Sequence, residues 1–251
     1  MCLIVVAIDA HPKFKLVIAA NRDEFYDRPT APAAFWPEAP QLLAGRDLRE
    51  SGTWIGITTE RRIAAVTNYR DPESLKAGSP SRGKLVSNFL LGREHPIQYL
   101  EQLSRDPNKY SGFNLLVGQR EEIYWYSNHG KEIRKLSPGI HGLSNHLLDT
   151  PWPKVKKGCE ALGRILAAEN PSTEELFQSL MDHTAAADES LPDTGIGLET
   201  ERMLSPVFIA SPGYGTRSST IIILDRNGGI TFTERSFSTQ GDWTDASFLI
   251  P

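Results

Sequence analysis

The sequence predicts an α+β fold built from two antiparallel β-sheets with helices outside them. Short apolar segments rich in β-branched residues come in pairs separated by turn residues, and segments with helical spacing lie between groups of these strands. The order strands, helices, strands fits two sheets flanked by helices. The chain has 251 residues, of which 39% are hydrophobic, so it can bury a large core. We therefore expect a single domain spanning residues 1–251.

The first thirty residues predict a hairpin. Leu3–Ile8 and Leu16–Ala20 are continuous apolar runs, typical of strands buried on both faces, and a charged turn containing proline separates them. Opposed residues of an antiparallel pair have a constant sum of residue numbers, which this turn sets at about 24 or 25. Cys2 is therefore expected to lie across from Arg22 or Asp23.

The remaining elements alternate between strands and helices. Strands are predicted at residues 53–58, 63–67, 113–117, 123–126, 132–136, 140–143, 207–210, 219–224 and 230–235. Helices are predicted at 84–91, 97–103 and 152–168, and a fourth begins after the capping residues Ser172 and Thr173 and ends near Met181. We expect residues 29–45 to be irregular and residues 185–203 to form a flexible polar segment.

Composition and charge exclude several classes of protein. The formal net charge of −4 predicts no general attraction to nucleic acid or to anionic membranes. No apolar stretch is long enough to predict a transmembrane helix, and residues 1–30 lack the features of a signal peptide, so a cytoplasmic or organelle-matrix protein is the default. The six histidines form no HExxH motif, and we expect no metal or cofactor. Nothing in the sequence indicates an oligomeric state.

The chain contains two cysteines, Cys2 and Cys159, and they receive different interpretations. Cys159 lies at helical spacing with Leu162 and Leu166, so we assign it to the core. Methionine aminopeptidases remove Met1 when the second residue is small, and Cys2 meets that condition. The mature chain would then carry a thiol nucleophile beside its own α-amine, a base with a pKa of about 7.7–8.0. The alternative interpretation of Cys2 is a buried strand residue without chemistry.

A polar segment follows the second strand of the predicted hairpin. Arg22 and Asp23, placed beside Cys2 by the expected register, could hold a thiolate and orient an α-ammonium. The alternative is a capped strand end that carries a surface ion pair. The pairing of a guanidinium and a carboxylate with an N-terminal thiol favours a site.

Two segments of this region resemble a known family. Residues 1–4 read Met-Cys-Leu-Ile, and residues 19–30 read Ala-Ala-Asn-Arg-Asp-Glu-Phe-Tyr-Asp-Arg-Pro-Thr. Together they resemble the signature of the NRDE family, which includes the transport-and-Golgi-organisation proteins. More distantly, the layout is similar to cysteine N-terminal-nucleophile hydrolases of the choloylglycine hydrolase and penicillin V acylase type. That resemblance implies a four-layer αββα sandwich of two antiparallel sheets flanked by helices.

The resemblance also implies further site residues. Asn68, in segment 66–69, matches a strand end that carries an oxyanion-hole group, and Asn145, in segment 142–145, matches a catalytic asparagine. Arg217, in segment 215–220, matches a late-strand arginine near the nucleophile. These hydrolases usually separate the arginine and the aspartate of the N-terminal motif by two residues, whereas Arg22 and Asp23 are adjacent. The sequence therefore leaves open whether Asp23 or Glu24 faces the thiol.

Two functions follow from these residues and from the resemblance. The first is hydrolysis of a linear amide or acyl substrate, in which Cys2 forms a thioester. The oxyanion is stabilised by Asn145 and by Asn68 or its neighbouring backbone amide. The second is non-catalytic binding or trafficking of haem or another hydrophobic ligand, because the NRDE family is linked to haem handling and lipid homeostasis. The sequence has no C-x-x-C-H motif for haem attachment. The state of the N-terminus discriminates the two, since catalysis needs a free α-amine and carriage does not.

Overall fold

The computed structural model describes residues 2–74, 78–120 and 122–251. They group into two compact units that are each discontinuous in sequence. The first unit comprises residues 1–27, 137–144 and 148–251, and the second comprises residues 28–136 and 145–147. Each unit contains one antiparallel sheet with helices packed on it, which confirms the predicted α+β class.

The sheet of the first unit has seven strands in the order β10-β1-β2-β12-β13-β14, with β11 beside β12. Their bounds are β1 (Cys2–Ile8), β2 (Phe14–Phe25), β10 (Gly139–Leu143), β11 (Ala210–Ser211), β12 (Tyr214–Asp225), β13 (Ile230–Phe237) and β14 (Trp243–Ile250). Every pairing in this sheet is antiparallel. The sheet therefore carries the N-terminal hairpin at its centre, which is where the continuous apolar runs of β1 and β2 find cover on both faces.

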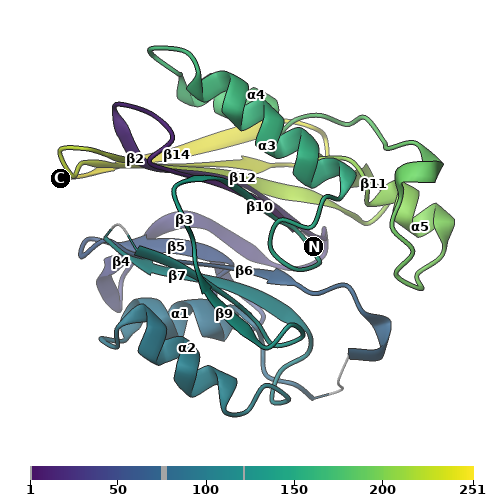
Figure 1. Ribbon diagram of the computed structural model, residues 1–251, viewed down its shortest axis with the longest axis horizontal. Coiled ribbons are helices and arrows are strands. Elements are labelled where there is room, and N and C mark those ends of the chain that lie inside the picture. The colour runs from purple at the N-terminus through teal and green to yellow at the C-terminus, as the bar shows by residue number, and fades with distance from the viewer. Residues whose placement is uncertain (1, 75–77, 121) are drawn as a thin grey trace. The chain divides into compact units, whose positions relative to one another are not determined.

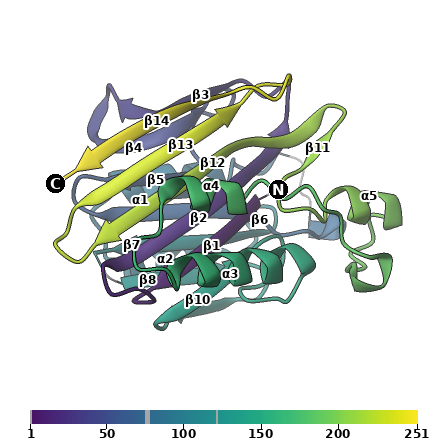
Figure 2. The ribbon, with the colours of Figure 1, turned by 90° about the horizontal axis from the view of Figure 1, so that it is seen from above.

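Two helices cover one face of this sheet, as Figures 1 and 2 show. Helix α3 (Pro153–Leu166) packs on β1 and β10, and α4 (Thr173–Ser179) packs on β12. Proline at the start of α3 suits the first helical turn, and a capping box between Ser172 and Glu175 starts α4. The core under these helices contains Leu3, Val5 and Ala7 of β1, which alternate with the residues of the other face.

The register of the hairpin confirms the first sequence prediction. Cys2 pairs with Arg22 and Leu3 with Asn21, so the residue numbers of opposed positions sum to 24. Strand β2 continues to Phe25, beyond the predicted end at Ala20, because β12 pairs with its polar end as well. This continuation places the Asn-Arg-Asp-Glu segment in the sheet rather than in a loop.

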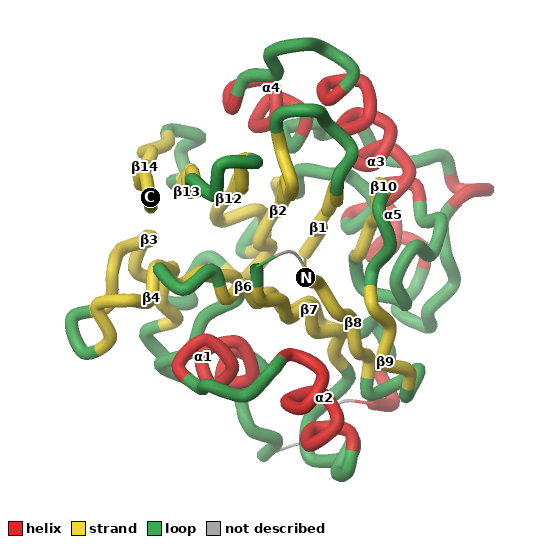
Figure 3. Tube along the Cα trace, turned by 60° about the vertical axis from the view of Figure 1, so that its left-hand side comes forward, coloured by secondary structure: helices red, strands yellow, loops and turns green. Residues whose placement is uncertain are grey.

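The second unit is a seven-stranded meander in the order β3-β4-β5-β6-β7-β8-β9. Its strands are β3 (Thr30–Trp36), β4 (Ala39–Asp47), β5 (Ile55–Thr58), β6 (Arg62–Asn68), β7 (Phe113–Gln119), β8 (Glu122–Ser127) and β9 (Glu132–Lys135). Helices α1 (Gly83–Leu91) and α2 (Pro96–Ser104) lie on one face of this sheet (Figure 3). Phe89 and Leu100 bring the two helices into a core with Phe113 and Tyr126 of the strands.

The structure corrects three sequence predictions and adds one strand that was not predicted. Residues 29–45, expected to be irregular, form β3 and most of β4. Pro32 is tolerated because β3 is the edge strand and its pairing with β4 is interrupted between Ala31 and Ala34. The polar segment 185–203 contains helix α5 (Leu198–Met203), and the final strand β14 was not predicted. The predicted strand 207–210 reduces to the short β11.

Candidate functional site

Cys2 begins β1, and its half-buried side chain lies at the end of the central hairpin. Arg22, its partner in the register, is buried, and antiparallel partners project from the same face of a sheet. The Ser144 hydroxyl donates a hydrogen bond to the carbonyl oxygen of Cys2 at 2.9 Å. Hydrogen bonding from two neighbouring segments of the first unit therefore fixes the main chain at the candidate nucleophile.

The groups around the Cys2 thiol have opposing effects on its pKa. In the chain that retains Met1, burial raises the pKa of the Cys2 thiol, and the carboxylate of Asp23 raises it further. A hydrogen bond from the Asp23 main-chain N–H and the positive charge of Arg22 both lower that pKa. The thiol is thus in an environment where loss of burial, or an added positive charge, would increase its thiolate fraction.

Of the two carboxylates that the sequence left open, Asp23 is the one whose charge acts on the Cys2 thiol, and a role for either in catalysis stays a prediction. Asp23 is buried and accepts a hydrogen bond from the Thr216 hydroxyl, with Oδ1 and Oγ1 2.7 Å apart. The same hydroxyl accepts a hydrogen bond from the Ile209 N–H at 2.9 Å, so its own proton is directed at Asp23. Burial raises the pKa of Asp23, whereas Lys154, the Thr216 hydrogen bond and Arg22 lower it. Glu24 lies opposite Gly215 and accepts from the Phe25 N–H.

Asn21 anchors the same strand end to the helical side of the sheet. Its amide nitrogen donates to the carbonyl oxygens of Leu180 and Val207, each at 2.8 Å, and its oxygen accepts from the Ser219 hydroxyl. Because side chains alternate along a strand, Asn21 and Asp23 share this face and Arg22 projects from the other. The Asn-Arg-Asp motif therefore divides into two residues that face the helices and one that faces Cys2.

Arg217 lies at an irregularity in the pairing of β12 with β2. Thr216 pairs with Asp23 and Ser218 pairs with Arg22, so Arg217 has no opposed residue in the ladder. Its guanidinium donates to the carbonyl oxygens of Phe25 and Tyr26 at 2.9 and 3.2 Å. These contacts place the Arg217 side chain along the segment that leaves β2, and a role beside the thiol stays a prediction.

The two asparagines that the resemblance implied meet each other in the second unit. The Asn145 side-chain amide donates to the Asn68 carbonyl oxygen at 2.9 Å, and the Asn145 carbonyl oxygen accepts from the Arg70 N–H at 2.7 Å. Asn145 is fully buried, and its amide nitrogen has two hydrogens, so the bond to Asn68 fixes the direction of the second. In the chain, Asn145 directly follows Ser144, the residue bonded to Cys2. The oxyanion role of both asparagines stays a prediction.

Asn114 supports this segment and was not found by sequence analysis. Its buried amide donates to the His146 carbonyl oxygen at 2.9 Å and to the Thr67 hydroxyl at 3.2 Å. Burial and the nearby His129 lower the pKa of His146, whose ring tilts against Tyr69. A polar residue inside the apolar strand β7 was the available signal for Asn114.

Lys154 is the second residue that sequence analysis missed. It belongs to α3, only 2% of it is exposed, and its charge acts on Asp23. The signal was present in the sequence, because Lys154 continues the helical stripe of Gly158 and Leu162 at intervals of four residues. A lysine on an apolar stripe is rarely buried without a charge partner.

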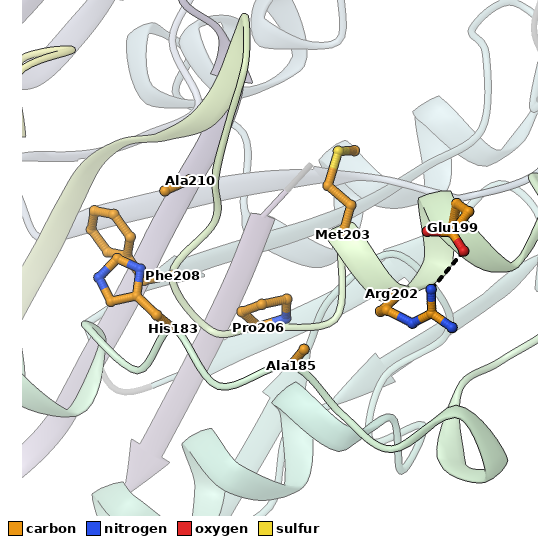
Figure 4. Close-up of a pocket in the computed structure, with 8 residues that line it drawn as sticks. All are labelled: His183, Ala185, Glu199, Arg202, Met203, Pro206, Phe208 and Ala210. Atoms are coloured by element: carbon orange, nitrogen blue, oxygen red, sulfur yellow. Dashed lines mark hydrogen bonds and ion pairs between the residues drawn. The ribbon is translucent and has the colours of Figure 1, made fainter.

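A pocket of about 360 Å³ lies beside the segment that hydrogen-bonds to Thr216 (Figure 4). It is lined by His183, Ala185, Glu199, Arg202, Met203, Pro206, Phe208 and Ala210. The His183 ring lies against Phe208 with centroids 4.6 Å apart, and Arg202 pairs with Glu199 on the opposite side. Phe208 and Ala210 flank Ile209, whose N–H and carbonyl oxygen both bond to Thr216. The pocket wall is therefore connected to Asp23 through Thr216.

Two features are absent from residues 2–74, 78–120 and 122–251. No group of three or more His, Cys, Asp or Glu side chains there is arranged to hold a metal ion. Among the helices of the same residues, none combines the length and the apolar character needed to cross a membrane.

Comparison with known proteins identifies the family. A family model described as Transport and Golgi organisation 2 matches residues 1–239. The chain belongs to this family. It is 38% identical to the human Transport and Golgi organization protein 2 homolog, covering 94% of this chain and 93% of the relative, and 30% identical to Transport and Golgi organization protein 2 of Drosophila melanogaster, covering 97% and 95%. The resemblance expected from the N-terminal segments is thus confirmed.

A solved structure is also similar to this chain. It is the Caenorhabditis elegans N-acylethanolamine-hydrolyzing acid amidase ortholog, with a TM-score of 0.43 and 11% sequence identity. The similarity covers 88% of this chain and 92% of the other.

Proposed function

We propose that this protein, once Met1 is removed, is an N-terminal cysteine amidohydrolase acting on a linear amide or acyl substrate. The observation that supports the proposal is the register in which Cys2 pairs with Arg22 and Asp23 lies one position further along β2. Removal of Met1 would expose the α-amine of Cys2 at this strand end. A thiol, a guanidinium, a carboxylate and a free amine would then share one strand end.

In the proposed acylation step, the Cys2 sulfur attacks the substrate carbonyl carbon and the α-amine of Cys2 takes the thiol proton. The carbonyl oxygen becomes an oxyanion, for which Asn145 and Asn68 are the proposed donors. As the oxyanion collapses, the C–N bond breaks and the ammonium gives its proton to the departing nitrogen. The products are a free amine and a thioester on Cys2.

In the proposed deacylation step, the α-amine takes a proton from water, and the resulting hydroxide equivalent attacks the thioester carbonyl carbon. The C–S bond breaks, the carboxylic acid leaves, and the proton returns to the sulfur. Arg22 is proposed to favour the thiolate, and Asp23 to hold the α-amine in place through its charge. The reaction consumes one water and needs no other reactant.

The experiment that tests the proposal compares processed protein with protein that retains Met1, using a panel of simple N-acyl amides. The processed form is expected to release amine and acid at a rate that rises with pH through one ionisation, because only the neutral α-amine accepts a proton. Cys2→Ser and the form retaining Met1 are expected to be nearly inactive. Equal turnover by both forms would exclude the mechanism, and no turnover by a protein shown by intact mass to lack Met1 would exclude the activity on these amides.

The pocket beside Phe208 favours a second candidate, which is binding of an apolar ligand without chemistry. Its volume of about 360 Å³ is at the lower end of the range typical of ligand sites, and Met203, Pro206 and Phe208 give it an apolar wall. Haem or a long-chain acyl compound would then be cargo rather than substrate. Binding with the same affinity by processed protein and by protein that retains Met1, with no turnover by either, would favour this candidate.

A further inference from the structure

Lys154 is an unusual lysine because it is buried at the start of a helix. It is the second residue of α3, which begins at Pro153, and only 2% of it is exposed. Two lysines that follow on the same helix differ: Lys156 is exposed, and Lys157 reaches the carboxylate of Asp182 at 3.1 Å. A buried lysine is costly unless an opposite charge is near, so its surroundings indicate its role.

The direction of α3 brings Lys154 to the Cys2 end of β1. One turn after Lys154 comes Gly158, where a Cβ atom would lie 2.9 Å from Val5 and 3.3 Å from Leu3. Further along the helix, Gly163 faces Ile140, whose partner in the sheet is Ala7. The helix therefore runs from the first residues of β1 toward its end, and Lys154, one turn before Gly158, lies beyond Leu3 at the start of the strand.

Asp23 lies at the same end and on the same face of the sheet. It is one position past the pairing of Cys2 with Arg22, and it shares its face with Asn21, which bonds to the helical side. The lysine charge acts on Asp23, where it lowers the pKa of the carboxyl group against the effect of burial. The course of α3 and the alternation of side chains along β2 are two independent observations. Both place Lys154 and Asp23 at the same end and on the same face of the sheet.

Other groups also act on Asp23. Arg22 adjoins it on β2 and pairs with Cys2, so both of those side chains project from the opposite face of the sheet. The Arg22 charge still lowers the pKa of Asp23, and the Asp23 charge acts on the Cys2 thiol. From β12, Thr216 donates to the carboxylate and the Tyr214 hydroxyl donates to the Asp23 carbonyl oxygen at 3.1 Å. Thr216 carries no charge, and the Tyr214 contact is to the main chain. Lys154 is the group that approaches from the helix.

We propose that Lys154 is a positioning residue, whose ammonium keeps the buried Asp23 carboxylate ionised so that it can hold the α-amine of processed Cys2. Its effect on turnover rests on the proposed amidohydrolase function. Its effect on Asp23 does not, and is measurable without substrate. An uncharged residue 154 would leave Asp23 more easily protonated, and a protonated Asp23 would no longer fix the amine through its charge.

The test uses full-length processed protein labelled with ¹³C at the aspartate carboxyl groups, with the Asp23 signal assigned from Asp23→Asn. Lys154→Met keeps the length of the side chain and removes the charge, Lys154→Arg keeps the charge, and Lys156→Met is the matched control on the exposed face of the same helix. In Lys154→Met, the midpoint of the Asp23 titration should rise by about one to three pH units, because a neighbouring opposite charge is lost. Lys154→Arg and Lys156→Met are expected to leave it near the wild-type position.

Turnover provides the second measurement. The acidic limb of the kcat/KM profile should move to higher pH in Lys154→Met, with activity recovered as pH rises, and Lys154→Arg should restore the wild-type profile. An unchanged Asp23 titration in folded Lys154→Met would overturn the inference even if the enzyme is active. A shifted titration in a processed protein that hydrolyses no amide would instead count against the proposed function alone.

Stability measurements keep the inference testable if Lys154→Met is too unstable for the titration. Removal of one member of a buried charge pair is destabilising, whereas removal of both is tolerated better. The double variant Lys154→Met/Asp23→Asn is therefore expected to melt at a higher temperature than Lys154→Met. A double variant that melts no higher than Lys154→Met would overturn the pairing.

Discussion

The Thr216 hydroxyl donates its proton to Asp23, and the direction of this hydrogen bond is set by the Ile209 N–H that the same hydroxyl accepts. The bond length of 2.7 Å is typical of a hydroxyl on a carboxylate. The bond helps Asp23 to stay ionised in a buried position, and it links the candidate site to the strand that walls the pocket.

Thr216→Val should test this link, because valine keeps the shape of threonine and removes the hydroxyl. The variant leaves the Ile209 N–H and one Asp23 oxygen without that partner, so we expect a loss of about 1–3 kcal/mol in the free energy of unfolding. Thr231→Val is the control, because Thr231 is a half-buried residue of β13, and it should change the free energy of unfolding by about 0.5 kcal/mol or less. Denaturant unfolding measures both, and equal effects would show that the Thr216 hydrogen bond has no special importance.

Alkylation by iodoacetamide should report on Cys2. In protein that retains Met1, burial raises the pKa of the Cys2 thiol, and burial with two nearby carboxylates raises the pKa of Cys159 to about 11, so both should react slowly at pH 7. Removal of Met1 puts an α-ammonium on Cys2 itself, next to the thiol, and this charge should accelerate the labelling of Cys2 alone. Peptide mass spectrometry measures the two rates.

The same assay tests Arg22. Because its positive charge lowers the pKa of the Cys2 thiol, Arg22→Met should slow labelling of Cys2 at pH 7, and higher pH should restore the rate. Labelling of Cys159 serves as the internal control and should stay constant. A rate for Cys2 that does not respond to Arg22→Met would remove the guanidinium from the proposed mechanism.

Asn145→Ala should affect both stability and turnover. Loss of the hydrogen bond to the Asn68 carbonyl oxygen should lower the free energy of unfolding by about 1–3 kcal/mol. Loss of an oxyanion donor should lower kcat by roughly 100- to 1,000-fold with little change in KM. Asn128→Ala is a matched control in the same unit, since Asn128 also bonds main-chain groups, those of Phe113, Pro107 and Tyr110. Comparable loss of kcat in both variants would assign Asn145 a structural role only.

The pocket should respond to a charge at Met203. This residue lines the pocket and is 38% exposed, so Met203→Asp should fold while placing a carboxylate against any apolar ligand. Leu198→Asp is the control, because Leu198 belongs to the same helix, is 51% exposed and does not line the pocket. Titration of a fluorescent long-chain acyl probe and of haem should show weaker binding in Met203→Asp alone. Identical affinities in the two variants would show that these ligands bind elsewhere.

The sequence predicted the N-terminal hairpin and its register because turn length alone sets which residues of a hairpin face each other. It could not show that Asp23, rather than Glu24, is held by Thr216, because that contact depends on β12, a strand almost two hundred residues away whose pairing shifts at Arg217. Lys154 was missed for a similar reason. Its place on the helical stripe was visible, but the packing of α3 on β1, which brings its charge to Asp23, was not.

The prediction for residues 29–45 was wrong because their composition disfavours a strand, whereas their position at the edge of the sheet permits one. Proline and alanine disfavour strands in general, yet an edge strand tolerates a proline whose missing N–H faces no partner. The last strand, β14, was missed because most of its residues are exposed, so it lacks the apolar run that marked β1 and β2. Its pairing with β13, rather than its own composition, keeps it in the sheet.

The extra residue in β12 has a consequence for how this region tolerates change. If Arg217 were deleted, the ladder could close without interruption, with Thr216 still opposite Asp23 and Ser218 still opposite Arg22. The change would remove the guanidinium that donates to the carbonyl oxygens of Phe25 and Tyr26. We therefore expect deletion of Arg217 to spare the hydrogen bond between Thr216 and Asp23, while it frees the segment that leaves β2 from β12.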